Sequence, residues 1–267
     1  RLKNHDMPPE EESQPTKAER DRLLQWLDQE INHFDYTQVN DPGYEPVRRL
    51  THLEFNHSIR DLFGVDLNLT EDFPADLSGT SGFDNSANTL FLQPALLERY
   101  VAVVDKILSL ALPETQETKE LSESWKLIFI VYPNKKISES EAAKSILQNF
   151  LKKAYRRPVT QHEWNRSLAT YQMARGAKLG FEQAIKKALN AALLSPNFLL
   201  KIESANESDQ PYRINDRELA NRLSYFLWAS LPDKQLADLA DKGKLLEDSI
   251  LEQEVKRMLA DPKSDSL

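Results

Sequence analysis

Five copies of one short helix-start pattern constrain the fold of this chain more than any other feature of its sequence. In each copy a Ser, Thr or Asn is followed three residues later by Glu. The first side chain can accept a hydrogen bond from a free backbone N–H, and the glutamate can accept one from the N–H of the capping residue. The pairs are Thr16 and Glu19, Thr51 and Glu54, Ser138 and Glu141, Thr160 and Glu163, and Asn215 and Glu218.

Apolar residues at helical spacing follow each of these pairs. After Thr51, for example, Phe55, Ile59 and Leu62 fall on one face of a helix that Gly64 would end. A helix with one apolar face buries that face against a neighbour, so the chain is predicted to contain five amphipathic helices. Further helices without the capping pair are predicted at Pro94 to Ala111, Phe181 to Leu194, Lys234 to Ala240 and Ile250 to Ala260.

Only two runs, Trp125 to Val131 and Phe198 to Ile202, have the composition of extended segments. Two short strands cannot make a substantial sheet. The predicted fold class is therefore mainly α, with multi-helix, bundle-like domains and at most two short strands. The polar segments that are predicted to be linkers are His33 to Pro46, Leu112 to Ser124 and Ser204 to Pro211.

Charge and cysteine content narrow the function classes. The formal net charge is -8, from 42 acidic and 34 basic residues, and the basic ones are scattered, so nucleic acid is not an expected partner. The one short basic cluster, Lys152, Lys153, Arg156 and Arg157, is interpreted as a solvated helix end. The chain has no cysteine, which excludes disulfides, thiolate metal sites and covalent haem attachment within these residues. No apolar run is long enough for a membrane span.

Candidate metal ligands occur in a loop between Asp72 and Asn88. This loop combines glycines with oxygen-bearing side chains, and its calcium candidates are Asp76, Asp84 and Asn85. It lacks the spacing of an EF-hand and the terminal bidentate glutamate. The alternative is an ordered structural loop rich in Asx turns, anchored by Phe73, Phe83 and Phe91.

Other metal and catalytic patterns are absent from the sequence. His52 and His57 would point about 140° apart on a helix with about 100° per residue, so no zinc site is predicted from them. There is no G-x-S-x-G elbow, phosphate-binding loop or dinucleotide fingerprint. The sequence therefore names no catalytic residue, and whether the chain is an enzyme stays open.

The opening segment has an unusual order of residues. Residues 5–31 read HDMPPEEESQPTKAERDRLLQWLDQEI, in which Met7 and two prolines precede an acidic loop and an amphipathic helix with Trp26 near its centre. A thioether can be the axial ligand of haem iron. A Met-Pro-Pro sequence also occurs in ordinary loops, where the methionine only fills space. Both interpretations stay open on the residues alone.

That segment resembles the C-terminal end of the c-type cytochrome domain found in planctomycete cytochrome-containing proteins. In that family a Met-Pro-Pro loop supplies the sixth iron ligand, and a helix bearing a tryptophan closes the domain. The resemblance implies that residues 1–34 are the C-terminal remnant of a cytochrome c-like domain, with Met7 as a haem axial ligand only in the full-length protein. Haem c is expected there, and none is expected in this fragment, which lacks C-x-x-C-H. Both ends of the chain are expected to be fragment ends.

The rest of the chain is similar to the helical domains of unknown function that follow this cytochrome. The resemblance implies a first helical domain at 45–113, a second at 125–203 and the truncated start of a third at 211–267. In many relatives a cysteine at the position of Val131 and another near Ala142 or Ala143 are present, so this chain resembles a member that has lost a disulfide. The motifs that carry the similarity are RRLTHLEFNHSIRDLFGVD with FPADLSGTSGFDNSANTLFLQPALLERY, AYRRPVTQHEW with GFEQAIKKALNAALLSPNFLLKIE, and ELANRLSYFLWASLPDKQLADLADKGKL.

The resemblance also implies a function and a compartment. The intact protein is expected to be exported, in the periplasm or cell envelope. The first hypothesis is a non-catalytic helical portion that serves electron transfer by positioning the haem domain and a partner. That partner would be a protein redox partner or downstream domains of the same chain. The alternative is a cell-envelope or polysaccharide-associated interaction scaffold, and a hydrolase comes third.

Overall fold

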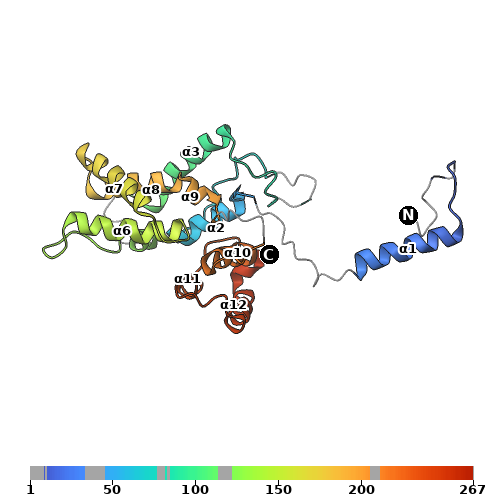
Figure 1. Cartoon of the computed structure of the whole chain (residues 1–267). Helices are drawn as coiled ribbons and strands as arrows, with labels where there is room; N and C mark the ends of the chain where they lie inside the picture. Colours follow the sequence, from blue (N-terminus) through green and yellow to red (C-terminus); the bar gives the residue numbers. More distant parts are fainter. Residues whose placement is uncertain are drawn as a thin grey trace. The chain divides into compact units, whose positions relative to one another are not determined.

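The computed structural model of the protein describes residues 9, 11–33, 46–76, 82, 85–113, 122–204 and 211–266. The chain forms two compact units, residues 1–44 with 207–211, and residues 45–206 with 212–267 (Figure 1). Within the described residues there are eleven α-helices, and the sheet has two strands. The predicted mainly α class is confirmed.

The first unit contributes one described helix, α1 (Lys17–Asn32). None of the helices that the structure describes is long and apolar enough to cross a membrane. The elements of the second unit are β1 (Arg48–Arg49), α2 (His52–Phe63), α3 (Pro94–Ala111), α5 (Glu123–Ile128), α6 (Glu139–Ala154), α7 (Gln161–Gly176), α8 (Phe181–Leu193), α9 (Pro196–Leu199), β2 (Leu200–Lys201), α10 (Asp216–Trp228), α11 (Lys234–Asp241), α12 (Asp248–Ala260) and a 3-10 helix, η2 (Pro262–Ser266).

All five predicted capping pairs form as hydrogen-bonded helix starts. At the start of α2, the N–H of Glu54 donates to the Thr51 hydroxyl at 3.1 Å, and the N–H of Thr51 donates to the Glu54 carboxylate at 2.8 Å. The helix ends at Gly64, whose φ of 70° lies in the left-handed region that favours glycine. Local capping chemistry therefore sets where these helices begin.

The prediction of an extended segment at Trp125 to Val131 is wrong, because α5 occupies most of it. Ser122 caps this helix by accepting a hydrogen bond from the N–H of Trp125. The Trp125 and Phe129 rings, four residues apart, stack with centroids 4.5 Å apart, which favours the helical turn over a strand. The prediction for Phe198 to Ile202 is right only for β2, since α9 takes up Phe198 and Leu199.

The two strands make a small antiparallel ribbon that joins distant parts of the second unit. Arg48 lies opposite Lys201, and Arg49 opposite Leu200. Next to the ribbon, the N–H of Leu50 donates to the carbonyl of Leu199 at 2.9 Å. The ribbon thereby fixes the start of α2 against the end of α9.

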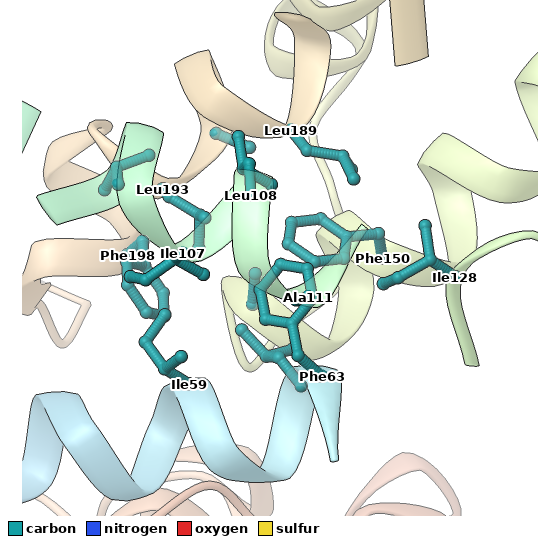
Figure 2. Packing of buried hydrophobic residues seen from close by; sticks show 14 of the residues in the cluster. Ile59, Phe63, Ile107, Leu108, Ala111, Ile128, Phe150, Leu189, Leu193 and Phe198 are labelled. Carbon is teal, nitrogen blue, oxygen red and sulfur yellow. The ribbon is translucent and has the colours of Figure 1, made fainter. Parts of the chain in front are cut away.

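One large hydrophobic cluster runs through α2, α3 and α5 to α9. Its members converge from helices that are far apart in the sequence, as Figure 2 shows for Ile59 and Phe63 on α2, Ile107 on α3, Phe150 on α6 and Leu189 on α8. Ala142 and Ala143 on α6 are fully buried. The two segments predicted as the first and second helical domains thus share a single core.

A second, smaller hydrophobic cluster lies among α10, α11 and α12. Trp228 is fully buried at its centre, and its indole N–H donates to the carbonyl of Met258 at 2.9 Å. Arg257 and Lys263 lie over the indole ring at 5.5 and 5.3 Å from its centroid. Cations over the face of a tryptophan are electrostatically favourable, so they add to the burial of the ring.

The loop predicted between Asp72 and Asn88 is anchored differently from the prediction. Phe73 is buried, with its ring edge against Tyr100 at 5.1 Å between centroids, as expected. Phe91 is 60% exposed, so its assignment as an anchor is wrong; the neighbouring Leu90 is fully buried in its place. Phe83 lies outside the described residues.

Candidate functional site

The predicted calcium site includes one residue whose role the structure describes in full. Asp76 accepts a hydrogen bond from Arg49 at 2.6 Å and another from the backbone N–H of His52 at 2.8 Å. Both of its oxygens therefore serve an ion pair and the first turn of α2. Asn85 is exposed, and Asp84 lies outside the described residues. Among the residues that are described, no three His, Asp or Glu side chains are grouped so that they could hold a metal ion.

A buried ion pair lies beside Asp76. The guanidinium of Arg48 donates to both oxygens of Glu54 at 2.7 Å, and both side chains are 6% exposed. Burial acts to raise the pKa of Glu54, but the hydrogen bonds and charge of Arg48 outweigh it and hold this pKa below its ordinary value. The pair is therefore ionised and ties the ribbon to α2.

Met7 lies outside the described residues, but the helix that follows it is described. Along α1, Leu23, Trp26 and Ile31 are 41%, 54% and 66% exposed. Together with Leu24 and Leu27 they fall on one face of the helix. An isolated helix of this length is marginal in water, and most helical stability comes from packing an apolar face. This face of α1 therefore needs a partner.

The prediction of a solvated helix end at the end of α6 is right for Lys152 and Lys153, which are exposed, and wrong for the two arginines that follow. Arg156, with a left-handed φ of 58°, turns its guanidinium inward. It donates to the carbonyls of Asn197, Phe198 and Leu200 at 2.7 to 3.1 Å, and to the Tyr225 hydroxyl at 3.1 Å. All of these acceptors are neutral, so the positive charge of Arg156 has no carboxylate beside it.

Arg157 also turns inward. It makes a two-pronged ion pair with Glu163, with N–O distances of 2.6 and 3.0 Å. These hydrogen bonds lower the pKa of Glu163 to about 2. Sequence reasoning missed both roles because a run of basic residues after a helix is read as solvated; the Pro158 that follows was the available sign that the chain turns there.

Beside Arg156 and Arg157 is a cleft of about 570 Å³. Residues from the end of α6 and from α10 and α11 line it, together with the apolar Leu62 and Leu231. The charged side chains that line it are seven cations, Lys152, Lys153, Arg156, Arg157, Arg217, Lys234 and Lys263, and four carboxylates, Asp61, Asp233, Asp238 and Asp241. Cations therefore predominate here although the whole chain carries a formal charge of -8.

A second hollow, of about 520 Å³, is lined by aromatic side chains. Trp125, Tyr132 and Phe181 line it together with Pro133 and Glu182. The indole N–H of Trp125 donates to the Tyr132 hydroxyl at 2.5 Å, and that hydroxyl donates to the Glu182 carboxylate at 3.0 Å. Burial is the main cause that raises the pKa of Tyr132 to about 12. The rings are thus fixed beside a carboxylate.

Three family models match the chain. Residues 48–113 match a protein of unknown function (DUF1587), residues 142–203 match a protein of unknown function (DUF1595), and residues 214–267 match a protein of unknown function (DUF1592). The three matches follow one another along the chain without overlapping. No curated protein and no solved structure matches it. None of the three matches includes residues 1–34, so the cytochrome remnant and the role of Met7 stay predictions.

The three matched segments meet at one buried hydroxyl. Tyr225 of the DUF1592 segment is 4% exposed, and its oxygen lies 3.0 Å from the hydroxyl of Ser58 in the DUF1587 segment. The same oxygen accepts the hydrogen bond from Arg156 of the DUF1595 segment. Burial raises the pKa of Tyr225, so the phenol is neutral and can donate to Ser58 while it accepts from Arg156.

Replacing Arg156 tests this junction. Arg156→Lys keeps the charge but cannot reproduce the planar fork that reaches four acceptors, so we expect a loss of about 1.5 to 3 kcal/mol in the free energy of unfolding. Urea denaturation followed by circular dichroism measures it. Arg166→Lys, the same change at an exposed position of α7, should alter stability by less than about 0.5 kcal/mol. Equal effects of the two substitutions would contradict the assigned role.

Proposed function

We propose that the chain is the non-catalytic helical portion of an exported c-type-cytochrome-containing protein, and that it serves electron transfer by positioning the haem domain and a partner. The observation that supports this most is the exposed apolar face of α1, with Leu23, Trp26 and Ile31. The helix that closes a haem domain must present such a face to the rest of that domain. Haem, when bound there, supplies one-electron chemistry.

The residues of this chain could supply only part of a haem site. Without cysteine the chain cannot form thioether bonds to the porphyrin, so its contribution is the axial thioether of Met7 and the packing face of α1. The second unit contributes a packed body, whose interior is one large core with a smaller one beside it. Such a body suits positioning. The partner is a redox protein or a downstream domain of the same chain.

The α1 face can be tested in the full-length protein. Trp26→Asp places a charge on the face that the haem domain buries, so we expect the free energy of unfolding of that domain to fall by roughly 3 to 5 kcal/mol. The Soret absorbance, recorded during denaturation, measures this change. Gln25→Asp, one residue away on the polar face, should have little effect. If both substitutions behave alike, the apolar face is not a packing surface of the haem domain.

Met7 is tested by the reduction potential of the full-length protein. Thioether ligation favours ferrous iron, so Met7→Ala should lower the potential and remove the near-infrared charge-transfer band. The neighbouring Asp6→Ala serves as the control, because this variant keeps the methionine ligand and should therefore keep the charge-transfer band. A potential and a band that are both unchanged in Met7→Ala would show that another residue is the ligand.

The aromatic hollow favours a second candidate, a polysaccharide-associated scaffold. Aromatic rings beside a few fixed polar groups form the usual lining of small-molecule sites, and sugar rings offer both apolar faces and hydroxyls. Tyr132 is 40% exposed and stacks on Phe129 with the ring planes 19° apart, which holds its outer face toward solvent.

Retention on insoluble polysaccharide tests this candidate. The purified chain should be retained on microcrystalline cellulose or chitin, and Tyr132→Ala should reduce the retained fraction at least about fivefold, as expected for the loss of a contact of roughly 1 kcal/mol. Tyr212→Ala removes an equally exposed tyrosine away from the hollow and should leave retention unchanged. Chains that pass through both matrices would contradict the scaffold function.

A further inference from the structure

Pairing the charges that line the cleft at the end of α6 leaves an excess of positive charge. Lys263 pairs with Asp61 at 2.8 Å and Lys234 with Asp238 at 2.5 Å. Arg157 and Asp233 are paired with residues outside the lining, Glu163 and Arg257 respectively. These groups therefore neutralise one another. The remaining lining cations are Lys152, Lys153, Arg156 and Arg217, and the one remaining carboxylate is Asp241.

Asp241 is shared by two cations. Its Oδ2 lies 2.5 Å from the Nζ of Lys152, and its Oδ1 accepts from the Nε of Arg217 at 3.0 Å. The hydrogen bond from Lys152 and the one from Arg217 hold the pKa of Asp241 below its ordinary value, so one negative charge faces two positive ones. The Asp241 carboxylate thus lies between a cation of α6 and a cation of α10.

Two further cations have no carboxylate partner. Arg156 donates only to neutral oxygens. Lys153 is exposed at the cleft, and no described residue forms an ion pair with it. The excess is thus three positive charges in one hollow, on a chain whose overall charge would repel anions elsewhere.

We propose that this cleft binds a small polyanion with phosphate or carboxylate groups, which bridges Lys153 on α6 and Arg217 on α10. Guanidinium and ammonium groups bind both kinds of oxyanion through charge-assisted hydrogen bonds. The cleft volume of about 570 Å³ is that of a small-molecule site. The bound anion joins the large hydrophobic cluster, to which α6 belongs, to the smaller cluster of α10 and α11. The site is independent of the proposed haem function.

Isothermal titration calorimetry with pyrophosphate and with citrate, at ionic strength matched by sodium chloride, tests the site on the whole chain. We expect one molecule bound per chain for at least one of the two probes, and the stronger probe identifies the ligand group as phosphate or carboxylate. Lys153→Ala should weaken binding at least about fivefold because one charge-assisted contact is lost. Lys144→Ala, on α6 but outside the cleft lining, should change affinity less than about twofold.

The Asp241→Asn variant tests whether the carboxylate between Lys152 and Arg217 competes with the bound anion. Removing the internal carboxylate frees Lys152 and Arg217, so the anion should bind at least about fivefold more tightly. Circular dichroism at the titration temperature shows whether each variant is folded. If Asp241→Asn is unfolded, Arg217→Lys is measured instead, and it should weaken anion binding because it removes the guanidinium. The proposal is overturned if neither probe binds at millimolar concentration, or if Lys153→Ala and Lys144→Ala weaken binding equally.

Discussion

The second unit depends on the guanidinium of Arg156 and the hydroxyl of Tyr225. Arg156 ends α6 and reaches three carbonyls around α9 and β2, so it replaces the backbone partners that these short elements lack. Through Tyr225 it also reaches α10. A guanidinium suits this position because its five donors lie in a fixed plane and can reach several carbonyl oxygens and a hydroxyl at once.

This junction also explains why the DUF1587, DUF1595 and DUF1592 segments behave as one body. Ser58, Arg156 and Tyr225 come from the three segments in turn, and they share one buried hydrogen-bond system. Ser230 and Lys263 both bond to Asp61 on α2, which adds a second tie between the first segment and the last. Side-chain contacts of this kind fix the relative placement of segments that short linkers alone would leave free.

The helices could be predicted from the sequence because their signals are local. Each capping pair spans four residues, and its geometry does not depend on the rest of the fold, so all five were right. The prediction of an extended segment at Trp125 to Val131 was wrong because the Ser122 cap and a ring contact at helical spacing outweigh the strand-like composition. The prediction that Arg156 is solvated was wrong for a different reason. Its hydrogen-bond acceptors lie about 40 to 70 residues away in the sequence, and nothing near it in the chain indicates them.

Net charge is likewise a poor guide to what one surface of this chain can do. A formal charge of -8 predicts repulsion of anions, yet the structure gathers seven cations around one cleft, while several glutamates elsewhere cap helices. A capping glutamate such as Glu163 or Glu218 accepts hydrogen bonds from backbone N–H groups, which partly compensate its negative charge. Capping carboxylates also reach the cleft: Asp233 caps α11 and lines the cleft, and Glu163 caps α7 and pairs with Arg157 of the lining. Seven cations against four carboxylates in the lining still leave a basic hollow in an acidic protein.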